Sequence, residues 1–235
     1  MEEKIKTGTL FAVGVGPGAS GLITQLAADT LRACPVIAAP RTASGKMLAL
    51  EIAAGAVNLS GKPILPLEHS MKRSLAEREK SYEKSEAALA RVLDTGQDVA
   101  LVNLGDVSIY ASGQYLLERL EKKGYHTVMV PGIPSFCAAA ARLGVSLTDM
   151  QSALHIVPGT ENLSKALDWP GTKIIMKTGH ELPKALEILQ QKGLLGKSSL
   201  ICDCGMKGEK LWPNLKELRP QEGETGYFAL IIVKE

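Results

Sequence analysis

The run VGVGPG at residues 13–18 is a glycine turn set between two patterned segments. An apolar stretch at 9–12 precedes the turn, and apolar residues at helical spacing follow it from residue 22 to residue 31. A strand that leads through such a turn into a helix lets backbone N–H groups approach a ligand that side chains would exclude. The run is therefore a candidate ligand-binding turn, with a tight turn that binds nothing as the alternative.

The first ligand to consider is a dinucleotide, because the turn reads as G-x-G-x-x-A from Gly14 to Ala19. An NADP-dependent reductase would bind pyrophosphate at this turn and would use Arg41 for the 2′-phosphate. Pro17 counts against this hypothesis, since it removes a backbone donor inside the turn and fixes φ. The next strand ends at Pro40-Arg41 without an acidic residue for a ribose, which counts against it as well.

Three further loops end predicted strands, where an open α/β sheet collects its ligands. The loop LGDVSIY offers Asp106, which could accept hydrogen bonds from hydroxyls or backbone amides, or could form an Asx-turn or a helix cap. The loop PGIPS brings Ser135 to a helix start, where capping is the ordinary role of a hydroxyl. The loop IIMKTG carries Met176, a residue type usually found in cores. Each loop alone is a weak indication of a ligand.

Strand and helix patterns alternate strictly over the first part of the chain. Such alternation indicates βαβ crossovers and a mainly parallel sheet, which we place in an N-terminal α/β domain of residues 1–132. The segment 55–73, with its glycine and prolines, is predicted to be irregular and a functional excursion from this domain. The predicted strands are 9–15, 36–39, 98–104 and 127–130, and the predicted helices are 21–33, 44–54, 74–95 and 112–123.

The pattern changes in the second part, for which we predict a C-terminal α/β domain of residues 133–235 with a mixed sheet. A helix at 135–143 opens it, and a second clear helix is predicted at 182–192. A long segment that contains proline, 207–224, separates the last two strands. The predicted strands are 153–157, 172–177, 198–203 and 227–233.

Composition excludes several classes of protein. The chain has 235 residues, of which 45% are hydrophobic and 22% charged, as in an ordinary folded protein. A formal charge of +2 disfavours a nucleic-acid binder. The N-terminus lacks a signal-peptide pattern, and no stretch of about 20 apolar residues predicts a membrane span.

The four cysteines indicate neither a disulfide framework nor a metal site. They form no C-x-x-C pair, and Cys202 and Cys204 have no nearby pair of histidines that could complete a metal site. Buried free thiols are the expected state, so we predict no metal and a cytoplasmic location.

Taken together in order and spacing, the loops resemble those of the tetrapyrrole (corrin/porphyrin) methylase family, which uses S-adenosylmethionine. The resemblance covers nearly the whole chain and makes Pro17 an expected residue. A non-catalytic protein on the same fold would be expected to have a degraded Gly-Asp or Pro-Gly loop, and both are intact here. The matching motifs are V-G-x-G-P-G at 13–18, G-D-x-x-I-Y at 105–110, V-P-G-I-x-S at 130–135, the Met176 strand and the closing YFALIIV at 227–233.

Within the family, the stretch 39–46 and the loop GDVSIY are most similar to methylases that act on C(20) of precorrin-2 or cobalt-factor II. Members that methylate uroporphyrinogen III typically carry Asp where this chain has Pro40. Two departures are Val107, where many members have Pro, and Pro134, where many have a small or hydroxyl residue. Another tetrapyrrole methylase step remains the alternative.

The resemblance implies that S-adenosylmethionine lies folded between the two domains, in an active cleft. Methyl transfer from a sulfonium is an in-line displacement that depends on proximity and orientation, so no strong catalytic base is required and none is assigned. The residues implied to bind the cofactor are Pro17, Leu104, Gly105, Asp106, Ile109, Pro134, Ser135, Met176 and Cys204.

The tetrapyrrole substrate carries many carboxylates, so cations should line its binding surface. Tyr110 is the best aromatic candidate for contact with the macrocycle. Family resemblance also suggests a homodimer. The candidate substrate residues are Arg41, Ser44, Lys46 and Tyr110, with His69, Lys72 and Arg73 as further cationic candidates.

Overall fold

The computed structural model describes residues 6–68, 75–218 and 228–234. It divides into two compact units, Met1–Pro134 and Ser135–Glu235, which we describe separately. Among the described helices, none combines the length and the apolar character that crossing a membrane would require.

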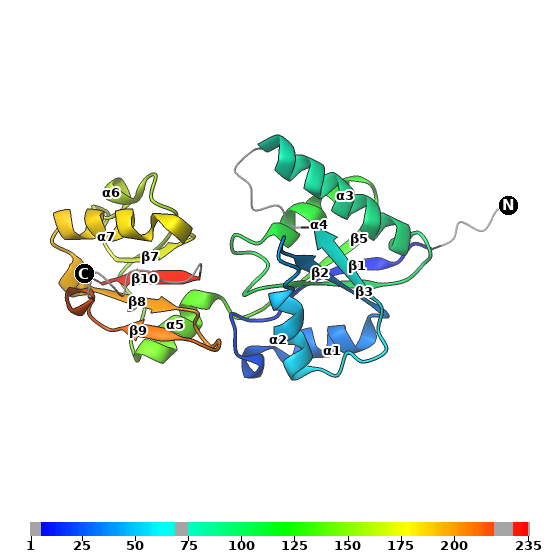
Figure 1. Cartoon of the computed structure of the whole chain (residues 1–235), viewed down its shortest axis with the longest axis horizontal. Coiled ribbons are helices and arrows are strands. Elements are labelled where there is room, and N and C mark those ends of the chain that lie inside the picture. Colours follow the sequence, from blue (N-terminus) through cyan, green and yellow to red (C-terminus); the bar gives the residue numbers. More distant parts are fainter. Residues whose placement is uncertain (1–5, 69–74, 219–227, 235) are drawn as a thin grey trace. The chain divides into compact units, whose positions relative to one another are not determined.

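The first unit contains a five-stranded sheet with the order β3-β2-β4-β1-β5 (Figure 1). Every pairing in it is parallel, which confirms the predicted parallel sheet. All side chains of the central strand β4 are buried, as expected for a strand covered on both faces. The strands are β1 (Thr9–Gly14), β2 (Val36–Arg41), β3 (Ile64–Glu68), β4 (Val99–Asn103) and β5 (His126–Val130).

Helices cover both faces of this sheet (Figure 1). Alternate residues of β4 show how: Ala100 and Val102 pack in the cluster that contains α1 and α2, whereas Val99 and Leu101 pack against α3 and α4. This period of two matches the pleat of a strand buried on both sides. The helices are α1 (Gln25–Ala33), α2 (Leu48–Ala56), α3 (Leu75–Leu93) and α4 (Ser112–Lys122), with a short 3-10 helix at Ser20–Leu22.

The prediction that segment 55–73 is irregular is wrong for part of its length. Residues 64–68 form β3, which pairs with β2 alone at the edge of the sheet. Pro66 is tolerated there because an edge strand has one side free of partners, so a missing N–H breaks no ladder. The helix predicted from residue 44 begins instead at Leu48, after a turn. Ser74, the first residue of the predicted helix 74–95, lies outside the described residues, and α3 is described from Leu75.

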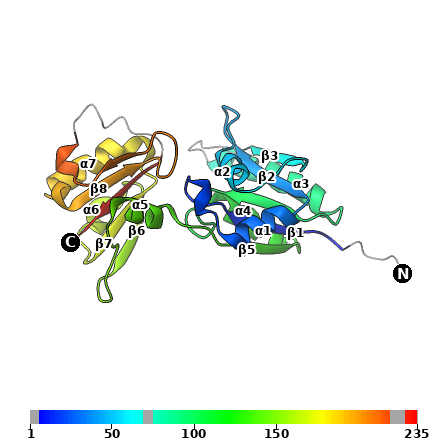
Figure 2. The ribbon, with the colours of Figure 1, turned by 90° about the horizontal axis from the view of Figure 1, so that it is seen from below.

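The second unit has a five-stranded sheet with the order β6-β7-β10-β8-β9. The sheet is mixed, which confirms the prediction for this part of the chain. β6 and β7 are parallel, and β10 is antiparallel to both β7 and β8. α7 and α5 lie on opposite faces of this sheet (Figures 1 and 2). The elements are α5 (Ser135–Leu143), β6 (Leu154–Pro158), α6 (Leu163–Ala166), β7 (Thr172–Met176), α7 (Leu182–Gln191), β8 (Ser198–Cys202), β9 (Lys210–Trp212) and β10 (Ala229–Val233), with 3-10 helices at Gly179–Glu181, Leu195–Lys197 and Leu215–Glu217.

The short strand β9 was missed because it lies in the segment 207–224, where no alternating pattern is long enough to see. It pairs with β8 as an antiparallel edge strand. The predicted last strand is confirmed as β10, while Tyr227 lies outside the described residues.

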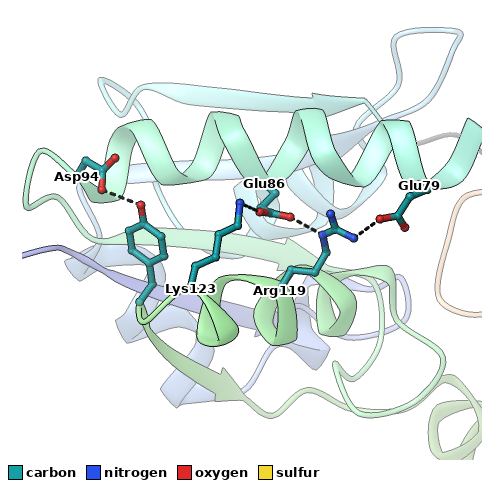
Figure 3. Close-up of polar contacts among 6 residues, drawn as sticks. Glu79, Glu86, Asp94, Arg119 and Lys123 are labelled. Atoms are coloured by element: carbon teal, nitrogen blue, oxygen red, sulfur yellow. Dashed lines mark hydrogen bonds and ion pairs between the residues drawn. The ribbon is translucent and has the colours of Figure 1, made fainter.

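A row of charged side chains joins α3 to α4 (Figure 3). Glu86 of α3 has a side chain only 4% exposed, and it accepts hydrogen bonds from Arg119 of α4 and from Lys123, which directly follows α4. Arg119 also reaches the exposed carboxylate of Glu79. Burial raises the pKa of the Glu86 carboxyl, but the hydrogen bonds from Lys123 and Arg119 outweigh burial and hold that pKa below its ordinary value.

We expect Glu86→Gln to lower the free energy of unfolding at pH 7 by about 1–3 kcal/mol, because a buried charge-assisted pair is lost. The depressed pKa means that the folded state gains this stability above the unfolded-state pKa and loses it as pH falls. The difference from wild type should therefore shrink below about pH 4.5. Urea unfolding at pH 7 and pH 4 measures both effects.

Glu79→Gln is the matched control, because it removes a carboxylate bound to the same Arg119 from a side chain that is 56% exposed. Its effect should be much smaller, as for other exposed ion pairs. Equal effects of the two substitutions would contradict a special role for the buried carboxylate.

Candidate functional site

The glycine turn after β1 and the loop after β4 lie side by side, because both strands are parallel and neighbouring. Gly16 and Gly105 exchange backbone hydrogen bonds, with N–O distances of 3.2 Å from Gly16 N to Gly105 O and 2.8 Å in return. Both glycines have left-handed backbone, with φ of +79° and +72°. A side chain at either position would be strained, so the glycines are needed for this pairing.

The loop after β5 approaches the same point. A Cβ placed on Gly132 would lie 2.2 Å from the carbonyl oxygen of Gly105 and 2.8 Å from Gly14 Cα. A Cβ on Gly14 would likewise meet Gly132 N at 2.7 Å. Three strand-end loops therefore meet backbone to backbone at a junction of Gly14, Gly105 and Gly132, in which neither Gly14 nor Gly132 has room for a side chain.

Asp106 fixes two of these loops to each other. One carboxylate oxygen, Oδ1, accepts from Ser108 N at 2.8 Å and from the Ser108 hydroxyl, which makes the Asx-turn considered from the sequence. The other oxygen, Oδ2, accepts from Gly132 N at 2.8 Å. The carboxylate is thus engaged by its own chain, and its effect on a ligand would be exerted through the position of the loops.

The charge of Asp106 is maintained by these contacts. Burial raises the pKa of the carboxyl, but the hydrogen bonds from Ser108 and from the Gly132 amide outweigh burial and hold the pKa below its ordinary value. The carboxylate therefore stays ionised at neutral pH and remains a strong acceptor for both partners.

Sequence reasoning missed Asn103, the last residue of β4. The residue is 4% exposed, and its side chain donates from Nδ2 to the Leu101 carbonyl at 2.8 Å. Gly113 makes room for it, because a Cβ there would lie 2.1 Å from Asn103 Oδ1. One signal was visible in the sequence: a polar residue that closes an otherwise apolar strand, directly before the Gly-Asp loop.

The other candidates of the first unit differ in exposure. Pro17 is buried beside the glycine junction, and Leu104 and Ile109 are half-buried. Tyr110, at the end of the same loop, has a positive φ of +50° and is 43% exposed as a residue. Non-glycine residues in this backbone region are uncommon and cluster at functional sites.

The substrate candidates on the other loop are exposed. Arg41 ends β2, and the following turn is held by Thr42, whose hydroxyl lies 2.9 Å from the Ser44 hydroxyl and accepts from Lys46 N at 3.1 Å. The turn is therefore ordered by its own hydrogen bonds, and it leaves the cationic side chains of Arg41 and Lys46 exposed. His69, Lys72 and Arg73 lie outside the described residues.

In the second unit, the candidates Met176 and Cys204 lie at or just after the carboxyl ends of two strands, β7 and β8. β7 and β8 run in the same direction on either side of β10, so their carboxyl ends share one edge of the sheet. Met176 ends β7 and is buried, and Cys204 comes two residues after β8 and is also buried. The residues that directly follow the two strands, Lys177 and Asp203, both have left-handed backbone, with φ of +59° and +51°.

The two remaining candidates, Pro134 and Ser135, are the last residue of the first unit and the first of the second. Both are half-buried, and Ser135 is the first residue of α5. Within the described part of the chain, no group of three or more His, Cys, Asp or Glu side chains is placed to hold a metal ion.

Comparison with known proteins identifies the class. The profile of the tetrapyrrole (corrin/porphyrin) methylases matches residues 9–219. The fold is that of a solved cobalt-precorrin-4 methyltransferase, with a TM-score of 0.73 at 19% identity over 96% of this chain and 94% of that one. A uroporphyrin-III C-methyltransferase from Thermus thermophilus gives a TM-score of 0.71 at 21% identity, over 97% and 92% of the two chains. The class is therefore that of the S-adenosylmethionine-dependent methyltransferases with two α/β units.

The chain belongs to the tetrapyrrole (corrin/porphyrin) methylase family, whose methyl donor is S-adenosylmethionine. It is 28% identical to a cobalt-precorrin-2 C(20)-methyltransferase of Salmonella typhimurium, over 97% of each protein. A probable cobalt-precorrin-2 C(20)-methyltransferase of Methanocaldococcus jannaschii is 32% identical over 78% of this chain and 77% of that protein. A precorrin-4 C(11)-methyltransferase of Sinorhizobium is 30% identical over 97% and 85%.

We expect Gly132→Ala to destabilise the first unit by about 3 kcal/mol, because the new methyl group would overlap the Gly105 carbonyl and force two loops apart. Gly21→Ala is the control, since a Cβ at Gly21 meets no atom within 4 Å. Urea unfolding followed by circular dichroism compares the two variants. Equal stability would show that the glycine junction is not tightly packed.

Proposed function

We propose that this protein transfers a methyl group from S-adenosylmethionine to the C(20) meso carbon of precorrin-2 or cobalt-factor II in cobalamin biosynthesis. The observation that carries the proposal is the glycine junction, in which three strand-end loops present backbone rather than side chains. Two relatives with C(20) names and the stretch around Pro40-Arg41 support the C(20) step. The similarity to a C(11)-methyltransferase makes that step the alternative.

The cofactor is proposed to bind mainly through backbone groups. Both carboxylate oxygens of Asp106 accept hydrogen bonds from the protein, one from Ser108 and one from Gly132. The side chain would therefore contribute to cofactor binding by holding the loops in place. When bound, S-adenosylmethionine would supply an electrophilic methyl group: the new carbon–carbon bond forms as the carbon–sulfur bond breaks, the electron pair of that bond stays on sulfur to give S-adenosylhomocysteine, and the ring releases a proton to water. The residues proposed to bind it are Pro17, Leu104, Gly105, Asp106, Ile109, Pro134, Ser135, Met176 and Cys204.

The rate of this reaction depends more on how the two substrates are positioned than on acid–base catalysis. The electron-rich ring carbon is itself the nucleophile, so the protein has to align it with the methyl group and exclude water. Arg41 and Lys46 are proposed to bind substrate carboxylates, with Ser44 on the same turn and Tyr110 against the macrocycle. Their exposure suits contact with a large, highly charged substrate. The homodimer expected from the resemblance stays a prediction.

Calorimetry with S-adenosylhomocysteine and with NADPH tests the cofactor. We expect the former to bind and the latter not to, because Pro17 removes a donor that pyrophosphate would need. Gly105→Val should weaken S-adenosylhomocysteine binding at least about tenfold. NADPH binding without S-adenosylhomocysteine binding would favour the reductase alternative instead.

Gly124→Val is the control for backbone strain. Gly124 has φ of +87°, close to the +72° of Gly105, and lies after α4, where an added Cβ meets no atom within 4 Å. Both substitutions should cost about 1–2 kcal/mol of stability, but only that at Gly105 should reduce affinity. Equal losses of affinity would mean that strain alone, not cofactor contact, explains the effect.

The position of the transferred methyl group tests the C(20) step. The protein is incubated with carbon-13-labelled S-adenosylmethionine and with precorrin-2, cobalt-factor II or uroporphyrinogen III. We expect one new methyl group on the C(20) meso carbon of precorrin-2 or of cobalt-factor II. We expect none on uroporphyrinogen III. A label at C(11) or on a pyrrole carbon would place the chain at another step, while leaving the cofactor assignment intact.

A further inference from the structure

The loop that follows β8 is folded into two consecutive turns, which we call the 203–209 turn. Met206 N donates to the Asp203 carbonyl at 2.9 Å, and Glu209 N donates to the Met206 carbonyl at 3.2 Å. The turn begins with the left-handed backbone of Asp203, at φ of +51°. Such backbone persists only where the surroundings impose it.

Glu209 closes this turn with its side chain. Oε2 accepts from Gly205 N at 2.7 Å, so the last residue of the turn is bonded to its middle. Arg142, in the last turn of α5, binds the same carboxylate: its Nε lies 2.9 Å from Oε1 and 3.2 Å from Oε2, and its Nη2 also donates to Oε1. The forked geometry of the guanidinium therefore fixes the orientation of the carboxylate.

The two side chains of this ion pair differ in their exposure to solvent. The Glu209 side chain is 12% exposed, whereas Arg142 is 57% exposed. The hydrogen bond from Arg142, followed by the one from Gly205 N, outweighs burial and holds the pKa of the Glu209 carboxyl below its ordinary value, so the carboxylate stays ionised at neutral pH. These contacts also hold the backbone from Asp203 to Glu209 in a single conformation.

Cys204 is the residue that this conformation buries. Burial raises the pKa of its thiol to about 11, the charge of Glu209 adds to that effect, and Arg142 opposes it. The side chain therefore remains a thiol at neutral pH. A thiolate beside a methyl sulfonium would be a competing nucleophile, so a neutral thiol suits a cofactor wall.

We propose that Arg142 and Glu209 are positioning residues for the methyl donor: they hold the 203–209 turn in the conformation that presents Asp203 and Cys204 to S-adenosylmethionine. This inference rests on the proposed function. It adds two side chains that do not themselves touch the cofactor, and it assigns the Arg142–Glu209 pair a role in cofactor affinity.

The test compares Glu209→Ala, Arg142→Ala and Arg142→Lys with wild type in a Cys137→Ser background. Cys137 is exposed, while Cys202 and Cys204 are buried, so removing Cys137 lets a thiol reagent report on the turn. Three quantities are measured: the dissociation constant of S-adenosylhomocysteine, the rate of Cys204 labelling located by peptide mass spectrometry, and the unfolding midpoint. Asp168→Ala is the control for the loss of an ion pair elsewhere in the second unit, because it breaks the bond between Lys192 Nζ and the exposed Asp168 carboxylate, at 2.5 Å.

We expect Glu209→Ala to weaken S-adenosylhomocysteine binding about tenfold and to accelerate labelling of Cys204. Arg142→Ala should do the same to a smaller extent, since the bond from Gly205 to Glu209 remains. Arg142→Lys should lose less affinity than Arg142→Ala, because lysine keeps the positive charge but lacks the paired N–H donors of the guanidinium. Asp168→Ala should change neither the affinity for S-adenosylhomocysteine nor the rate of Cys204 labelling.

Faster labelling with unchanged affinity in Glu209→Ala and Arg142→Ala would overturn the proposal, because the pair would then be merely structural. Unchanged labelling and affinity in both variants would overturn it as well. Wild-type protein that fails to bind S-adenosylhomocysteine at all would overturn the proposed function, and this inference with it.

Discussion

The hydrogen bond from the Gly132 amide to the Asp106 carboxylate is the contact on which the arrangement of loops at the carboxyl edge of the first unit's sheet depends. It joins loops that are 26 residues apart in the chain and sets them against the glycine turn after β1. Gly14 and Gly132 have no room for a side chain, so the polar groups that the three glycines themselves offer are backbone ones. That is a suitable surface for adenosine and amino-acid groups, and an unsuitable one for pyrophosphate, because Pro17 lacks an N–H.

The same principle recurs in the second unit with different residues. Strained backbone at Lys177 and Asp203 follows two parallel strands, and the Arg142–Glu209 pair holds the second of these turns. In both units a carboxylate accepts hydrogen bonds from backbone N–H groups and thereby fixes a loop at the carboxyl edge of a sheet: Asp106 in one, Glu209 in the other. Charged side chains thus serve to position backbone, which agrees with a reaction that depends on orientation.

Much of the fold could be predicted from the sequence, because its strands and helices carry strong local patterns. β4 is apolar throughout, and the alternation of strand and helix determined the parallel sheet. β3 was missed because it is an edge strand with a proline and mostly exposed side chains, so it lacks both alternation and an apolar run. β9 has only three residues, too few for a pattern.

The site was predictable where its contacts are local. Asp106 and Ser108 are two residues apart, so the Asx-turn could be considered from the sequence, but the bond to Gly132 depends on how parallel strands bring distant loops together. Asn103 and Gly113 were missed for the same reason, since the need for glycine at position 113 arises from a side chain on another element. Glu209 and Arg142 are 67 residues apart and carry no motif.

A crystal structure of the complex with S-adenosylhomocysteine would show which groups of the first unit bind the methyl donor. We expect the ligand to make backbone hydrogen bonds within the Leu104–Asp106 loop, against the glycine junction, with the Asp106 carboxylate still bonded to Gly132. A ligand bound elsewhere, or one that displaces Gly132 from Asp106 and takes the carboxylate for itself, would contradict this expectation.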